Sequence, residues 1–271
     1  MAVKVKGKAM LFDAEKCIAC RACEIACLEW NNLPGDDTSF SPTYTNPEYV
    51  TSRTWTTIIF HELWGSSGKP PYWVFTKMQC FHCLHPTCAE VCPTRALHID
   101  KDTGAVVWDS NKCIGCGYCE VACPFGIIKL NKETKTIDKC TFCNDRVKNG
   151  IPPACAQACP TGALVFGDYD EIRAKTEAMH KEGRYVYGLH EVGGTRYMIA
   201  LPKGVKPKDV GLPHCDTTKP AYAKSDTKDY GYRGFVERVI AEWVSIGVVG
   251  GLILAGLVKA RTRKEGEKKE G

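Results

Sequence analysis

The sequence has little net charge and no recognisable catalytic motif. Among 271 residues, 36 Lys and Arg against 31 Asp and Glu give a formal net charge of +5, and six of the basic side chains lie in the tail KARTRKEGEKKEG. A basic surface spread over the body is not expected, so nucleic-acid binding is not predicted. There is no catalytic triad or paired-carboxylate pattern, and the glycines of EVGGTRYM do not form a dinucleotide fingerprint.

Cysteine, in contrast, is abundant, with 17 in the chain. Sixteen of them form four groups, and Cys215 stands apart. The groups are Cys17, Cys20, Cys23 and Cys27; Cys80, Cys83, Cys88 and Cys92; Cys113, Cys116, Cys119 and Cys123; and Cys140, Cys143, Cys155 and Cys159. The first and third groups have the C-x2-C-x2-C-x3-C spacing of bacterial ferredoxins, in which three thiolates hold one iron–sulfur cluster and the fourth ligates the other. The spacing therefore predicts that one group serves two clusters.

The sequence around the groups also repeats. CPTRALHI (92–99) and CPTGALVF (159–166) are near copies, and polar turns join apolar runs at 96–109 and 127–138. Proline disfavours the helical conformation in the cysteine before it, which turns the chain where it leaves the site. Ligand loops between small hairpins predict an α+β fold of two duplicated, bacterial-ferredoxin-like two-cluster modules, with four [4Fe–4S] clusters in total.

Two other roles for the cysteines, disulfide bonding and zinc binding, would indicate a different kind of protein. A disulfide framework fits poorly, because C-x-x-C repeated in register is a ligand pattern. Zinc is an alternative in the fourth group, where eleven residues separate the two pairs of cysteines. On that interpretation the chain is a zinc-stabilised scaffold protein.

The groups divide the chain into segments. A first half-module (1–79) carries an inserted segment (28–79), which is either a hairpin that completes a small core or a partner-docking surface. A central two-cluster module (80–139) follows, and then a second half-module (140–183) that pairs with the first. The pattern at 168–183 predicts a helix with Asp168 as its N-cap and Gly183 as its stop. Residues 184–238 are expected to extend toward a membrane.

The run VIAEWVSIGVVGGLILAGLV (239–258) predicts a single transmembrane helix, since about 20 apolar residues span a bilayer core. Gly247, Gly251 and Ala255 form a small-residue face suited to packing against another membrane subunit. The basic tail (259–271) predicts a cytoplasmic C-terminus, with the cluster domain on the exported, extracytoplasmic side. The first residues contain no apolar h-region and no twin arginine, so export with a signal-bearing partner is expected.

Together these features resemble the four-cluster electron-transfer subunits of molybdenum and tungsten oxidoreductases. Among those, the chain is most similar to the iron–sulfur (beta) subunit of membrane-bound respiratory formate dehydrogenase. The resemblance is carried by FDAEKCIACRACEIACLEWN, CIGCGYCEVACPFGIIKLNKE, KCTFCNDRV, PACAQACPTGAL, EVGGTRYM and the C-terminal apolar run.

The resemblance implies a subunit of anaerobic respiration that has no catalytic site of its own. Such a subunit conducts electrons from a molybdenum or tungsten bis-pterin subunit that oxidises formate to a membrane cytochrome b and quinone. The equivalent subunit of a nickel–iron hydrogenase, or of another molybdopterin oxidoreductase, is the alternative, because it differs only in the electron donor.

The resemblance also implies how the sixteen thiols are shared. It assigns them to a first set nearest the catalytic subunit (Cys17, Cys20, Cys23, Cys159), a second set (Cys27, Cys140, Cys143, Cys155), a third set (Cys92, Cys113, Cys116, Cys119) and a fourth set, last and near the membrane (Cys80, Cys83, Cys88, Cys123). His82, His85 and His214 are either tuners of the clusters or ordinary surface and structural residues. Cys215 is expected to be a bystander thiol.

Overall fold

The computed structural model of the chain describes residues 5–64, 72–213 and 215. The transmembrane helix predicted at 239–258, the basic tail and residues 216–238 of the predicted extension lie outside this part. Within the described residues, none of the helices has the length and apolar character needed to cross a bilayer.

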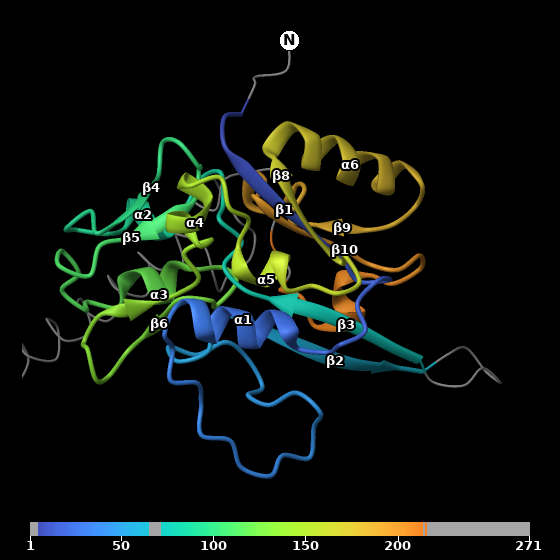
Figure 1. Ribbon diagram of the computed structural model, residues 1–271, viewed down its shortest axis with the longest axis horizontal. Helices are drawn as coiled ribbons and strands as arrows, with labels where there is room; N and C mark the ends of the chain where they lie inside the picture. The colour runs from blue at the N-terminus through green and yellow to red at the C-terminus, as the bar shows by residue number, and fades with distance from the viewer. Residues whose placement is uncertain (1–4, 65–71, 214, 216–271) are drawn as a thin grey trace, which may run out of the picture.

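A four-stranded sheet joins the two ends of the described chain (Figure 1). Its strands are β1 (Lys8–Asp13), β8 (Leu164–Asp168), β9 (Val186–Tyr187) and β10 (Tyr197–Ala200), in the order β8-β1-β10-β9. β1 is parallel to β10 and antiparallel to β8, and β9 is antiparallel to β10. The N-terminal strand therefore lies between two strands from the last third of the described chain.

β1 is buried on both faces, so its sequence is a continuous apolar run without alternation. Ala9 and Leu11 pack with the apolar face of α6 (Tyr169–Lys181), whereas Met10 and Phe12 point to the main core, which also contains many of the cysteines. The sheet thus separates a helix-covered face from a face that supports the cysteine loops.

Three antiparallel hairpins surround these loops. They are β2 (Thr57–Leu63) with β3 (Tyr72–Met78), β4 (Leu97–Ile99) with β5 (Val106–Trp108), and β6 (Lys129–Leu130) with β7 (Ile137–Asp138). The hairpins predicted at 96–109 and 127–138 are confirmed, and the inserted segment contains the β2–β3 hairpin. In Figure 1 this long hairpin is drawn below α5 and to the right of α1, with α6 at the top of the view.

Most of the remaining helices are short, and four of them carry cysteines of the groups. They are α1 (Ala22–Trp30), α2 (Thr87–Glu90), α3 (Tyr118–Ala122), α4 (Asn144–Lys148), α5 (Ala154–Gln157) and the 3-10 turns η1 (Glu191–Gly193) and η2 (Pro207–Val210). The helix predicted at 168–183 is α6, with Asp168 at its N-cap position. The Asp168 carboxylate makes no cap hydrogen bond; it accepts one from Lys8 Nζ at 2.7 Å instead.

Two carboxylates tie distant segments together. Asp13, at the end of β1, contacts Arg184 Nη2 at 2.6 Å, and both side chains are buried. Asp100, after β4, accepts hydrogen bonds from the Thr103 N–H at 3.1 Å and from Asn144 at 3.1 Å, and it pairs with Lys148 at 2.6 Å. Burial alone would raise the pKa of Asp100, but these partners, with Lys148 foremost, hold it well below its ordinary value. Asp100 thereby joins the β4–β5 hairpin to α4.

Candidate metal centres

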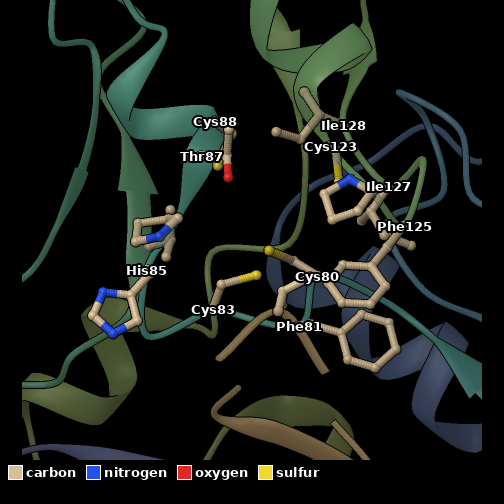
Figure 2. A pocket seen from close by; sticks show the side chains of 14 residues that line it. Cys80, Phe81, Cys83, His85, Thr87, Cys88, Cys123, Phe125, Ile127 and Ile128 are labelled. Carbon is tan, nitrogen blue, oxygen red and sulfur yellow. The ribbon is translucent and has the colours of Figure 1, made fainter. Parts of the chain in front are cut away.

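The thiols assigned to the fourth set line one pocket (Figure 2). Cys80, Cys83, Cys88 and Cys123 surround about 420 Å³ of space. Cys80 and Cys83 follow β3, Cys88 lies in α2, and Cys123 follows α3. Apolar side chains form most of the remaining wall, namely Phe81, Val106, Phe125, Ile127, Ile128 and Val192. The two central cysteine groups thus contribute ligands to a single pocket with largely apolar walls.

A second pocket brings together the thiols assigned to the first set. Cys17, Cys20, Cys23 and Cys159 line about 310 Å³ of space, with Phe12 from β1 and Ile58 from β2 in its wall. Cys159 lies 136 positions after Cys23, and it reaches this pocket because β8, which follows it closely, pairs with β1. The sheet therefore carries the end of the fourth group to the first.

The other eight cysteines also gather as two sets of four. Burial raises the pKa of Cys27 well above its ordinary value, and the neighbouring Cys140, Cys155 and Cys143 raise it further. Burial likewise raises the pKa of Cys119 to about 12, with further contributions from Cys116, Cys113 and Cys92. In each case the three neighbours are the members of the set that the resemblance implies.

The first C-x-x-C loop of each of the four groups has an unusual backbone conformation. The residue before the second cysteine has a positive φ in every loop, namely Ala19 (55°), His82 (47°), Gly115 (66°) and Phe142 (63°). The left-handed conformation costs about 1–2 kcal/mol for a residue with a Cβ. It curls the loop, so that the N–H of Ala19 donates to Cys17 Sγ at 3.4 Å and that of Phe142 to Cys140 Sγ at 3.3 Å. Such loops present N–H groups to sulfur ligands.

The cysteines that precede proline-threonine have a second shared environment. Burial alone would raise the pKa of Cys92. Hydrogen bonds from the backbone of Leu97 and Ala96 and from Thr94 lower this pKa below its ordinary value. Cys159 has the same arrangement, in which the N–H of Leu164 is the largest lowering contribution. The near copies CPTRALHI and CPTGALVF thus fold into the same thiolate-stabilising turn.

Electrostatic interactions between thiols of different sets indicate the order of the sets in space. Cys23 of the first set interacts with Cys155 of the second. Cys140 of the second set interacts with Cys80 of the fourth, and Cys88 of the fourth interacts with Cys119 of the third. The order is therefore first, second, fourth, third, which differs from the implied order, in which the fourth set comes last. The fourth set lies between the other two because Cys80, after β3, is a neighbour of Cys140, whereas Cys88, in α2, is a neighbour of Cys119, in α3.

The histidines and the extra cysteine take different positions. His82 is fully buried, and its Nδ1 accepts the Val106 N–H at 3.0 Å, so its ring proton is on Nε2. His85 lines the pocket of the fourth set, and His214 lies outside the described residues. Cys215 is buried 3.7 Å from the Tyr187 hydroxyl, and it belongs to none of the four sets.

Two buried lysines also lie beside the cysteines, and the sequence analysis did not single them out. Lys77, in β3, is fully buried, and Lys139, before Cys140, is almost so. A lysine in the strand-like run YWVFTKM and another at the start of KCTFC were the available signals, but nothing in the sequence indicates that either is buried.

The thiols fit iron–sulfur clusters. Among the described residues, no three His, Cys, Asp or Glu side chains come close enough together to hold one metal ion. In a cubane each thiolate binds a different iron, so four thiols surround the group without converging on one point. The unpartnered Nε2 of His82 and Oγ1 of Thr87, which are buried beside the fourth set, add polar groups suited to sulfur.

Comparisons with known proteins agree with this donor set. The 4Fe-4S dicluster domain family matches residues 71–169. The chain is 40% identical over 207 residues to the iron-sulfur subunit of the nitrate-inducible formate dehydrogenase of Escherichia coli K12, covering 74% of this chain and 70% of that one. It is 38% identical over 208 residues to the formate dehydrogenase iron-sulfur subunit of Haemophilus influenzae, covering 74% and 66%. It is also 28% identical over 294 residues to the hydrogenase-2 operon protein HybA of Escherichia coli O157:H7, covering 94% and 85%.

Proposed function

The chain belongs to the family of formate dehydrogenase iron–sulfur subunits, and we propose that it conducts electrons from a formate-oxidising molybdenum or tungsten bis-pterin subunit to a membrane cytochrome b and quinone. Members of this family are electron-transfer components that carry [4Fe–4S] clusters, and the fold is a ferredoxin-like α+β domain. The clusters supply one-electron carriers when they are bound.

The observation that carries the proposal is the continuity of the four thiol sets. Each set has cysteine neighbours in the next, through Cys23 and Cys155, then Cys140 and Cys80, then Cys88 and Cys119. This continuity supports a path from the first set through the second and fourth sets to the third. It also supports the assignment of four thiolates to each of four clusters, in two duplicated modules.

The two ends of this path suit electron entry and exit. Cys20 of the first set and Cys116 of the third are exposed, whereas Cys27, Cys140 and Cys155 in the middle are buried. Exposed apolar side chains flank both ends, with Ile18 beside Cys20 and Ile114 beside Cys116. Partner subunits docked on these surfaces would exclude water from the outer clusters.

The proposal includes a membrane location. Residues 239–258 would span the bilayer, the basic tail would remain in the cytoplasm, and the cluster domain would lie on the extracytoplasmic side. The small-residue face of Gly247, Gly251 and Ala255 would pack against the cytochrome b subunit.

The first experiment is to measure iron and zinc in the anaerobically purified chain and to record EPR spectra after reduction. Four cubanes predict about sixteen irons per chain and magnetically interacting signals. Stoichiometric zinc with little iron would refute the electron-transfer role and favour the scaffold interpretation.

A hydrogenase partner is the second candidate, because the similarity to HybA extends over 94% of the chain. Reduction of the clusters in the native complex by formate, but not by hydrogen, is the result expected from the proposal. Reduction by hydrogen alone would identify the chain as the hydrogenase-type subunit.

A further inference from the structure

Lys77 lies at the junction between the first and second sets. Its side chain is fully buried in β3, and the thiols that act on its charge are Cys155, Cys23, Cys140 and Cys27. Cys23 belongs to the first set, and the other three belong to the second. The lysine therefore faces two cluster sites at once.

A buried ammonium group needs a compensating negative charge, and the side chains around Lys77 other than the cysteines supply little of it. Its Nζ donates to Gln79 Oε1, a neutral acceptor, and it lies 5.6 Å from the centre of the Tyr197 ring. The Glu24 carboxylate interacts electrostatically with Lys77, but it accepts its hydrogen bond from the Ile58 N–H. Among the described residues, no carboxylate lies within ion-pair distance of Lys77. An isolated buried charge is strongly unfavourable, so the thiolates and the groups they bind are the counter-charge.

Lys139 lies in a similar way at the junction between the second and fourth sets. It is almost fully buried, and its Nζ donates to the carbonyls of Val106 and Cys140, the latter at 2.9 Å. Cys140 belongs to the second set, and the Lys139 charge also acts on Cys88 of the fourth set. Among the described residues no carboxylate pairs with Lys139 either.

We propose that Lys77 and Lys139 are fixed cations that raise the reduction potentials of the clusters on either side of them, an inference that rests on the proposed cluster assignment. A reduced cluster carries more negative charge than an oxidised one, so a nearby cation stabilises the reduced form. Because both lysines are shielded from water, solvent screens this interaction weakly. A cation between two clusters also lessens the repulsion that an electron on one exerts on an electron entering the next.

The test is an EPR-monitored redox titration of the full chain, loaded anaerobically with iron and sulfide. Lys77→Met and Lys139→Met remove the charge but keep an unbranched side chain. Lys175→Met, on the exposed face of α6, is the matched control. Cysteine-to-serine variants in each set assign the EPR signals to the sets.

We expect Lys77→Met to lower the potentials of the first and second sets, and Lys139→Met those of the second and fourth. In each case the equilibrium constant for reduction should fall at least about tenfold, which is about 59 mV for a one-electron couple. The control should leave all potentials unchanged. Methionine variants that load fully and keep wild-type potentials would overturn the inference, as would an equal shift in the control.

Loss of iron is also informative. If both methionine variants fail to load, Lys77→Arg and Lys139→Arg keep the charge and should restore iron; failure of all four would show that the lysines act through shape alone and overturn the inference. The titration uses chemical mediators, so it is independent of the donor. A chain whose clusters respond to the lysines but are not reduced by formate would refute the proposed partner and leave this inference intact.

Discussion

Gly115 gives the most direct test of how the loops are built around the clusters. It lies between Cys113 and Cys116 with φ at +66°, and a Cβ at this position would lie 2.1 Å from the carbonyl oxygen of Lys135, in the β6–β7 turn. Gly115→Ala would therefore force the loop and the turn apart by about 0.9 Å, since real Cβ atoms do not approach closer than 3.0 Å.

Gly117→Ala is the matched control. Gly117 also has a positive φ, at +74°, but no atom lies within 4 Å of its Cβ position. This variant incurs only the left-handed cost of about 1–2 kcal/mol. Gly115→Ala incurs that cost and an overpacking cost of about 1–3 kcal/mol.

The assay compares iron per chain, EPR spectra and thermal unfolding midpoints of the two variants. We expect Gly117→Ala to keep its full iron, whereas Gly115→Ala should lose the cluster of the third set, about four irons. Its unfolding midpoint should also fall below that of Gly117→Ala. Equal iron and equal midpoints in the two variants would refute the argument that the Lys135 carbonyl sets the position of the loop.

Three further substitutions test contacts described above. Asp13→Ala removes the 2.6 Å partner of the buried Arg184 guanidinium, which keeps Glu15 at 3.3 Å, and should lower the free energy of unfolding by about 1.5–3 kcal/mol; an unchanged unfolding midpoint would contradict this. Asp100→Asn should destabilise the chain most above about pH 4, and the destabilisation should shrink steadily as the pH is lowered below that value. The depressed pKa of Asp100 means that its contribution is fully present above about pH 4 and is lost as the pH falls toward the folded-state value; a pH-independent difference in unfolding midpoints would argue against it. Tyr197→Phe removes the 2.7 Å hydrogen bond to the Lys77 carbonyl and should cost about 1–3 kcal/mol without loss of iron, as denaturant unfolding and iron analysis can check.

The sequence predicts the elements whose signals are local. The spacing of the cysteines indicates cluster ligands, because short loops of fixed length are needed to wrap a cubane. The hairpins at 96–109 and 127–138 and the helix at 168–183 follow from apolar runs bounded by turn residues and caps, and all three are present. The transmembrane helix at 239–258 rests on a local signal too, and it stays a prediction.

The sequence does not predict features that depend on packing between distant segments. The order of the sets depends on which cysteine loops meet across the modules, as Cys140 meets Cys80. The burial of Lys77 depends on segments far away in the sequence, among them α1 and α5, whose cysteines are its neighbours, and a lysine in a strand gives no sign of that. The positive φ of Phe142 is equally hidden, because bulky residues rarely adopt this conformation unless the surrounding structure imposes it.

The position of β1 has a consequence for synthesis of the chain on the ribosome. Its two neighbours, β8 and β10, end at Asp168 and Ala200, so the first strand has no sheet to join until most of the described chain has been made. The β4–β5 and β6–β7 hairpins, in contrast, need only residues up to Asp138, and local contacts of this kind form early. The middle of the protein can therefore fold before the N-terminal strand has its partners, so that Cys17, Cys20 and Cys23, which are synthesised before the other three cysteine groups, are among the last thiols to be enclosed.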